Sequence, residues 1–275
     1  MTQPTLSSAL KSLEDQFGVL IVERGSRFRN FTPKGERVLD RARRIVGDSR
    51  AMRQEIEGLR HGLTGHLRLA AIPTALPFVT ELTVPIRARY PAVRFTVLSM
   101  NSDAILDRLE NLEIDVGITY VDTEPAGKFQ TVLLYEEQYV LLVAPESPLA
   151  KKKSVTWTEA GQIPLCLLTP DRQNRRLIDR HLADAGSPQV PTLESNSLLV
   201  LYAHVRTGEW MSILPARLAE TLDKPARLRS IAITHPAVTH RIGLIAVKRE
   251  PHSPLVAAFI AHAIRIATSA AAVPA

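Results

Sequence analysis

The chain has 275 residues, of which 45% are hydrophobic and 23% charged, and its formal net charge is +6. This length predicts two or three lobes with a large core, and the composition is that of an ordinary globular protein. No apolar run reaches the roughly 18 residues that a membrane helix needs, and residues 1–20 lack the hydrophobic stretch of a secretory signal. We therefore predict a cytoplasmic protein without a membrane partner.

Catalytic and metal motifs are absent from the sequence. A single cysteine, Cys166, excludes an intrachain disulfide and a cysteine-based zinc site, and we expect it to be a buried thiol. The eight histidines show no H-E-x-x-H spacing, and the chain contains no G-x-S-x-G elbow, G-x-G-x-x-G motif or Walker loop. We predict that the protein is not an enzyme and has no catalytic residues, no metal site and no cofactor.

Positive charge is concentrated near the N-terminus. Two acidic residues accompany eight basic ones in this stretch: Arg24, Arg27, Arg29, Lys34, Arg37, Arg41, Arg43 and Arg44. The local excess of six positive charges equals that of the whole chain. It indicates either a polyanionic partner, since neutralised phosphates release counterions, or a solvated helix face.

The first predicted elements are a short helix over 4–16, two short strands over 19–22 and 28–31, and a helix that starts at Thr32 and Pro33. The second helix carries a heptad seam: Val38, Ala42, Ile45, Ser49, Met52, Ile56 and Leu59. A narrow apolar seam on a charged helix indicates pairing with a partner helix, and packing against its own chain is the alternative.

Gly58, Gly62 and Gly65 are expected to break this helix, and strands then alternate with helices. The predicted order is strand 67–72, helix 76–89, strand 93–98, helix 102–112, strand 114–120, strand 138–143, strand 165–168, helix 173–184, strand 190–193, helix 197–206, strand 212–214, strand 241–247 and helix 253–268. Such alternation implies parallel βαβ units, and the length fits two doubly wound α/β lobes.

A series of short motifs resembles LysR-type transcriptional regulators from Gln3 to about Arg265. The motifs occur in the family's order: QPTLSSALKSLE at 3–14, FG at 17–18, ER at 23–24, FTPKG at 31–35, GHLRL at 65–69, PT at 73–74, RYP at 89–91, DVGI at 115–118, ESNS at 194–197 and ILP at 213–215. Each motif is weak alone, and their common order and spacing carry the resemblance.

The resemblance implies a domain plan and partners. It implies a partial winged helix-turn-helix over 1–34, a linker and dimerisation helix over 35–61, and a periplasmic-binding-protein-like effector domain over 65–269. Lobe I would comprise about 65–137 and 241–269, and lobe II about 138–240. The implied partners are double-stranded promoter DNA, a small-molecule effector and a second copy of the chain, in a dimer or tetramer.

The resemblance also implies DNA contacts. The recognition helix would enter the major groove and the wing would touch the backbone or minor groove. The residues concerned are Gln3, Pro4, Thr5, Ser7, Ser8 and Lys11 of the helix and Arg24, Arg27 and Arg29 of the wing. Many relatives have arginine where Ser8 stands, so Ser8 is either a contact or simply an exposed residue.

Relatives carry about two further helices ahead of the recognition helix. Without them Leu6, Leu10 and Leu13 lack packing partners, and burial of each is worth roughly 1.5–3 kcal/mol. We therefore expect weak folding or weak DNA binding of this module, through a start codon assigned too far downstream or a shortened gene. The alternative functions are a DNA-binding-deficient dimerising modulator and a two-lobed solute-binding protein of transport type.

Relatives bind their effector between the lobes, where strands end and helices begin, and such positions favour anions. The candidates here are Pro73, Thr74, Ser102, Thr119, Thr169 and Asn196. Each of the polar residues is alternatively a helix N-cap. Trp210 either narrows the cleft or belongs to the core. Hydroxyls and an amide in a small cleft predict a small anionic effector, and the stretches 165–176 and 204–210 are similar to relatives linked to formate metabolism.

Overall fold

The structure is a computed structural model that describes residues 3–23, 30–122, 127–222, 228–249 and 251–271. The chain divides into two compact units, Met1–Ile56 and Glu57–Ala275, and each is described by itself. Among the described residues, none of the helices has the length and apolar character needed to cross a membrane.

The first unit begins with helix α1, Gln3–Phe17, which confirms the helix predicted over 4–16. Gly18 follows it with a positive φ of 63°, a conformation that glycine adopts without a steric penalty. Two strands were predicted next, and residues 28 and 29 of the second lie outside the described residues. The described residues form one antiparallel bridge between Val22 and Phe31, supported by a 3.0 Å hydrogen bond from Glu23 N to Asn30 O.

Helix α2, Pro33–His61, starts as the sequence predicts. The Thr32 hydroxyl accepts a 2.9 Å hydrogen bond from Gly35 N, so it caps one of the unpaired amides of the first turn. It also donates to Leu20 O at 2.6 Å, which ties the cap to the preceding loop. The prediction that Gly58 breaks the helix is wrong, because one glycine costs only about 1 kcal/mol in a helix interior. The helix ends before Gly62, whose φ is 72°.

Gly35 lies where α2 crosses the chain that follows α1. A Cβ atom at this position would overlap the carbonyl group of Ile21, which is itself buried. The Glu14 carboxylate fixes the same segment, since its Oε1 accepts hydrogen bonds from Ile21 N at 2.6 Å and Val22 N at 3.2 Å. The small core of this unit therefore depends on a close approach that only glycine allows.

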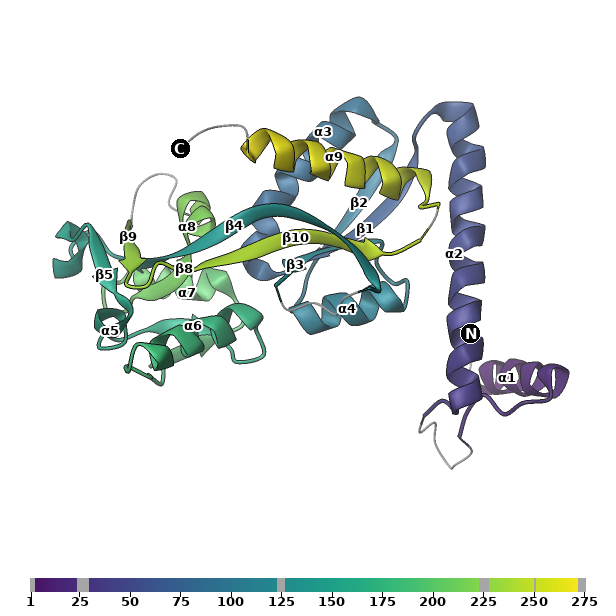
Figure 1. Cartoon of the computed structure of the whole chain (residues 1–275), viewed down its shortest axis with the longest axis horizontal. Coiled ribbons are helices and arrows are strands. Elements are labelled where there is room, and N and C mark those ends of the chain that lie inside the picture. The colour runs from purple at the N-terminus through teal and green to yellow at the C-terminus, as the bar shows by residue number, and fades with distance from the viewer. Residues whose placement is uncertain (1–2, 24–29, 123–126, 223–227, 250, 272–275) are drawn as a thin grey trace. The chain divides into compact units, whose positions relative to one another are not determined.

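The second unit opens with the predicted alternation of strands and helices (Figure 1). Its first elements are β1 Gly65–Ala71, the 3₁₀ helix η1 Pro73–Phe78, α3 Val79–Arg89, β2 Val93–Ser99, α4 Ser102–Glu110 and β3 Val116–Tyr120. Strands β2, β1 and β3 lie side by side and parallel. The helix predicted over 76–89 instead starts as η1 at Pro73, because two prolines near its start disfavour regular α-helix.

Two long strands, β4 Phe129–Val143 and β10 Thr239–Val247, run antiparallel along the middle of the second unit. The first part of β4 pairs with β10, which pairs with β3, and its last part pairs with β8 and β9. One continuous strand therefore joins the two lobes. The sequence predicted only 138–143, because the adjacent Glu136 and Glu137 interrupt the apolar pattern of the preceding residues.

The remaining elements form lobe II and then return to lobe I. They are η2 Pro148–Lys151, β5 Ser154–Thr156, α5 Trp157–Ala160, β6 Cys166–Leu168, α6 Gln173–Asp184, β7 Leu193–Ser195, α7 Leu198–Val205, β8 Ser212–Pro215, α8 Ala216–Leu222, β9 Arg229–Thr234 and α9 Pro254–Ala271. The sequence predicted neither β5, α5, α8 nor β9, which are short. The strand order is β2-β1-β3-β10-β4-β9-β5, with β8 beside β4 and a separate β6-β7 pair.

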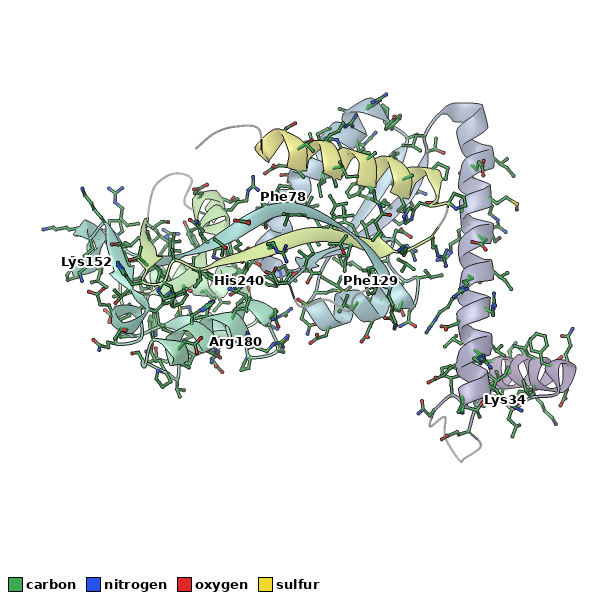
Figure 2. All side chains as sticks on the ribbon, viewed as in Figure 1. Lys34, Phe78, Phe129, Lys152, Arg180 and His240 are labelled. Atoms are coloured by element: carbon green, nitrogen blue, oxygen red, sulfur yellow. The ribbon has the colours of Figure 1, made fainter. Side chains whose placement is uncertain are left out.

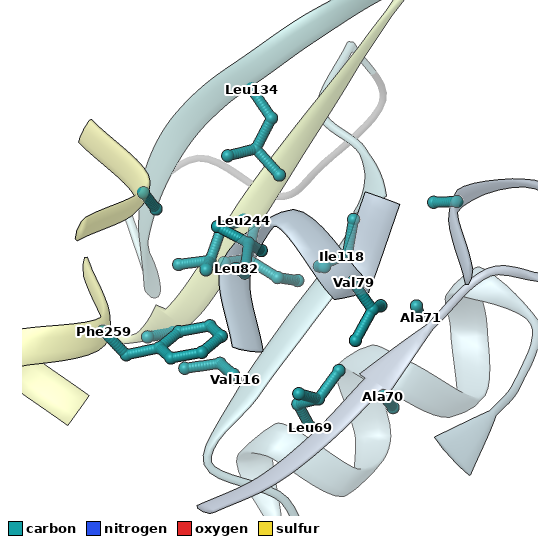
Figure 3. Close-up of a cluster of buried hydrophobic side chains, with 14 of the residues drawn as sticks. Leu69, Ala70, Ala71, Val79, Leu82, Val116, Ile118, Leu134, Leu244 and Phe259 are labelled. Atoms are coloured by element: carbon teal, nitrogen blue, oxygen red, sulfur yellow. The ribbon is translucent and has the colours of Figure 1, made fainter. Parts of the chain in front are cut away.

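Each lobe has its own hydrophobic core. Leu69, Ile118 and Phe259 lie in the core of lobe I, where α9 packs on the sheet (Figure 3). In lobe II one cluster surrounds Trp157 and a second surrounds Leu201, on the two faces of its sheet. The predicted α/β fold of two lobes is confirmed, with the refinement that antiparallel β4 and β10 join parallel βαβ segments.

Candidate effector site and DNA-facing helix

A pocket of about 220 Å³, counting its open mouth, lies between the two lobes. Its lining residues come from strand ends and helix starts of both: Ile72, Pro73, Thr74, Asn101, Ser102 and Tyr120 of lobe I, and Leu168, Arg172, Gln173 and Asn174 of lobe II. This is the position expected for a ligand of an open α/β sheet.

Two helix N-termini meet at this pocket. The side chain of Asn101 caps α4 by accepting a 2.9 Å hydrogen bond from Ala104 N. Helix α6 follows Arg172, whose side chain makes no capping hydrogen bond. Because unpaired amides and the helix dipole make an N-terminus electropositive, both helices favour an anion between them.

Two buried polar atoms at the pocket have no hydrogen-bond partner. The Oγ1 atom of Thr74, a residue 4% exposed, is one of them. The other is Nε of Arg172, which lies 3.4 Å from Asp171 Oδ2 without hydrogen-bond geometry. A buried donor without a partner costs free energy, so both atoms suit a bound polar ligand.

The predicted effector residues occupy different places around this pocket. Pro73, Thr74 and Ser102 line it. Thr119 lies behind the lining, 1% exposed, and donates a 2.9 Å hydrogen bond to Ser102 Oγ. Thr169 is outside the lining, where its hydroxyl donates to Asp171 Oδ1 at 2.5 Å.

Asn196 is also outside the lining and is exposed. Sequence reasoning missed five lining residues with polar side-chain groups: Asn101, Tyr120, Arg172, Gln173 and Asn174. A usable signal existed, since Tyr120 ends a predicted strand and the predicted helices at 102 and 173 start at or beside the others. Trp210 packs beside the core of lobe II and donates to Thr192 Oγ1 at 3.0 Å, and it does not line the pocket.

Cys166 is buried, as predicted. Burial raises the pKa of its thiol to about 11, so the thiolate, which is the reactive form, is scarce at neutral pH. No group of three or more His, Cys, Asp or Glu side chains able to hold a metal ion occurs among the residues that the structure describes.

In the first unit, α1 has a polar and an apolar face. The side chains of Thr5, Ser7, Ser8 and Lys11 are exposed. Leu6 is 59% exposed, whereas Leu10 and Leu13 are half-buried. The side chains of Gln3 and Pro4, and the whole of Arg24, Arg27 and Arg29, lie outside the described residues.

Helix α2 carries exposed apolar side chains along much of the predicted seam. Ile45, Met52 and Ile56 are 69%, 56% and 48% exposed, and Ala42 is exposed as well. The seam also contains Val38 and Ser49, which are half-buried, and Leu59, whose side chain lies outside the described residues.

Two α/β lobes joined by crossing strands, with a polar pocket between them, define a small-molecule-binding domain of the periplasmic-binding-protein type. Residues 60–267 match the LysR substrate binding domain family. The chain is 31% identical to a probable nitrogen assimilation transcriptional activator of Synechococcus elongatus, over 94% of this chain and 84% of that protein.

Solved structures have the same fold. A full-length OxyR variant from Pseudomonas aeruginosa matches with a TM-score of 0.73 and 24% identity, over 98% of this chain and 87% of that one. Full-length CbnR in complex with its target DNA matches with a TM-score of 0.66 and 21% identity, over 97% and 91% of the two chains.

The chain belongs to the LysR family of transcriptional regulators. It is a DNA-binding transcription regulator whose two-lobed domain binds a small-molecule effector. Regulators of this family bind double-stranded DNA and form oligomers. The alternative of a solute-binding protein of transport type is therefore not retained.

Proposed function

We propose that the effector is a small anion bound between Arg172 and the N-termini of α4 and α6. The observation that carries this proposal is the convergence of one arginine and two helix N-termini on a pocket whose lining residues include no aspartate or glutamate. Asp171 is a counter-charge for Arg172, since its Oδ2 atom lies 3.4 Å from Arg172 Nε. The unpartnered hydroxyl of Thr74 would donate to the same ligand.

The size of the pocket supports a ligand of few atoms. The space of about 220 Å³ between the lobes counts its open mouth, so the enclosed part of the pocket is smaller still. A carboxylate or inorganic monoanion of a few heavy atoms therefore fits better than a large organic effector.

Thermal-shift measurements on the full chain test the anion. Formate, acetate and nitrate are the probes, and the neutral amides formamide and acetamide are the matched controls. At least one anion should raise the melting temperature, because a ligand that binds only the folded state stabilises it by RT ln(1 + [L]/Kd). Equal responses to anions and amides, or none, would contradict the proposal.

Variants locate the anion. Arg172→Gln and Thr74→Val should each reduce the anion-dependent shift, since each removes a donor at the pocket. Arg229→Gln, at an exposed position of β9, is the matched control and should respond as the unaltered chain does. A full response of Arg172→Gln would place the anion elsewhere.

We further propose that α1 reads DNA through Gln3, Pro4, Thr5, Ser7, Ser8 and Lys11, with Arg24, Arg27 and Arg29 contacting phosphates. Spacings of three and four residues put Ser7, Ser8 and Lys11 on one helix face, away from Leu10 and Leu13. The exposure of those three side chains supports this assignment. Hydroxyls and a lysine suit base edges and phosphates in a major groove.

Duplexes selected from a random pool supply a binding site for the test. Lys11→Ala should weaken binding to every duplex and reduce the dependence of log K on log salt by about one phosphate contact. Thr5→Ala and Ser7→Ala should instead change the selected sequence. Lys153→Ala, an exposed lysine of lobe II, is the control. The assignment fails if Lys11→Ala binds as tightly as the unaltered chain at every salt concentration.

We also propose that the seam of α2 pairs two copies of the chain and that the protein works in the cytoplasm without catalytic activity. The boundaries proposed for its parts are 1–34, 35–61 and 65–269. Exposed Ile45 and Met52 support pairing, because burial of these apolar side chains against a partner helix would stabilise the dimer.

A further inference from the structure

A buried carboxyl lies directly behind the effector pocket. Glu137, on β4 where that strand pairs with β10, is 2% exposed. Its Oε1 accepts a 2.9 Å hydrogen bond from Tyr120 Oη, and its Oε2 is buried without a hydrogen-bond partner. No ion pair of Glu137 occurs among the described residues. A buried carboxylate with one hydrogen bond and no counter-charge is costly, so the neutral acid is favoured.

This carboxyl is connected to the pocket by hydrogen bonds. Asn174 Nδ2 donates to Tyr120 Oη and to Tyr139 Oη, at 3.3 Å each. Tyr120 and Asn174 both line the pocket, so Glu137 is one hydrogen bond away from a lining residue. A change in its charge therefore acts on the side chains that meet a bound anion.

We call the group formed by Tyr120, Glu137, Tyr139, Asn174, His181 and His240 the crossing cluster. His240 of β10 lies opposite Glu137 in the strand register, and Figure 2 shows it between the two lobes. Its Nε2 atom lies 2.9 Å from His181 Nε2 of α6. One ring donates and the other accepts, so at least one of them is neutral in this arrangement.

The titratable groups of the crossing cluster change charge in different pH ranges. Burial raises the pKa of Glu137 to about 8. Burial lowers the pKa of both His181 and His240 below the ordinary histidine value, so they are charged only in acid. Burial and the charge of Glu137 raise the pKa values of Tyr120 and Tyr139, which stay neutral.

Tyr135, on β4 two residues before Glu137, also has a pKa raised by burial and stays neutral. Glu137 is thus the member of this group that changes charge between pH 7 and pH 9. The nearest competing titrations, those of the histidines, occur at lower pH.

We propose that Glu137 is a proton-linked positioning residue of the effector pocket: an anion binds when this carboxyl is protonated, and affinity is lost as the carboxyl ionises. The inference rests on the proposed anion. The neutral acid presents no charge to the anion and leaves Tyr120 and Asn174 in place. The carboxylate repels the anion across one layer of side chains and binds its hydrogen-bond donors more tightly.

The sign and size of the pH effect follow from linkage. Binding that needs one protonated group is flat below the pKa of that group and falls by a factor of ten per pH unit above it. With a pKa of about 8, affinity at pH 9 should be about tenfold weaker than at pH 7. Near pH 8 each anion bound should take up about half a proton from solution.

Titration calorimetry of the full chain with formate, acetate and nitrate, at pH 7 and pH 9, tests this inference. These probes keep one negative charge throughout that range. Measurements at pH 8 in buffers with different ionisation enthalpies count the protons and need no variant. Tenfold weakening at pH 9 with proton uptake at pH 8 would support the proposal.

Glu137→Gln keeps an acceptor for Tyr120 but cannot ionise, so its affinity should differ less than twofold between pH 7 and pH 9. Glu136→Gln makes the same change at the exposed neighbouring position and should keep the tenfold difference. Binding that is equal at both pH values and takes up no proton would overturn this inference and leave the anion proposal intact. Absence of binding by any of the three probes at pH 7 would overturn both.

Discussion

The two units of the chain differ in how deeply they bury their large apolar side chains. In the first unit Ile21 is buried, whereas Phe17, Ile45 and Met52 are about half or more exposed. In the second unit large side chains such as Phe259 are fully buried. Burial of apolar area is the main source of folding free energy. The second unit therefore carries its own stability, while the first presents surface that association can cover.

Removal of a large side chain from the second unit should have the largest effect. Phe259→Ala, in the core of lobe I, should lower the free energy of unfolding by about 3–5 kcal/mol, because it leaves a cavity among buried neighbours. Urea unfolding followed by tryptophan fluorescence measures this. Phe17→Ala, at a residue 54% exposed, is the matched control and should cost less than about 1 kcal/mol. Equal losses of unfolding free energy in the two variants would contradict this difference in burial between the units.

The buried acid of the second unit should make its stability depend on pH. Glu137 has a folded-state pKa of about 8, above the ordinary value of 4.5. The folded state then holds a proton that the unfolded state releases, so stability falls as pH rises between these values. The slope should be about 1.4 kcal/mol per pH unit relative to Glu137→Gln.

Urea unfolding of both proteins from pH 5 to pH 9 measures that difference. It should level off above about pH 8, where both states of the unaltered chain are ionised at this position. Parallel stability curves for the two proteins would show that Glu137 is ionised throughout.

Two glycines of helix α2, Gly35 in the first unit and Gly58 in the second, should respond oppositely to substitution by alanine. Gly35→Ala would place Cβ against the Ile21 carbonyl and should destabilise the first unit by roughly 1–3 kcal/mol. Gly58→Ala meets open space and should stabilise the helix by about 0.5–1 kcal/mol. Amide hydrogen exchange over residues 19–22 and 33–45 gives the change. Protection that is unaltered in Gly35→Ala would refute the close approach.

Substitution at the seam of α2 should have the smallest effect on the stability of the single chain. It should nevertheless weaken dimerisation measurably. Ile45→Ser removes an exposed side chain, so unfolding of the monomer should change by less than about 0.5 kcal/mol. The dimer should dissociate at least tenfold more readily, since both copies lose a buried contact. Sedimentation velocity measures this. Val46→Ser, exposed but off the seam, should leave dimerisation unchanged.

Much of the secondary structure could be predicted because it depends on neighbouring residues. Helix α6 has the predicted bounds of 173–184, and the cap at Thr32 has the predicted hydrogen bond. Short elements such as β5 and α8 have too few residues for periodicity to appear. The sequence predicted only part of strand β4, because its acidic residues resemble those of an exposed loop, although Glu137 is buried.

The pocket was predicted only in part, for a related reason. Local sequence identified Pro73, Thr74 and Ser102, since these follow a strand or open a helix. Arg172 and Asn174 join them because α6 of lobe II starts opposite lobe I. The predicted helix start at 173 marks the position of Arg172, but no neighbouring residue shows that this helix starts opposite lobe I.

By itself the sequence determined the family and the strong helices, and it predicted an effector site at the ends of strands. These rest on motif order and on periodicities that short segments carry. Only the tertiary structure decided that Tyr120 and Asn174, 54 residues apart, meet at the pocket and that Glu137 is buried behind them. The charge of that carboxyl depends on its burial in the folded chain and on the hydrogen bond from Tyr120 of β3, and no single segment encodes either.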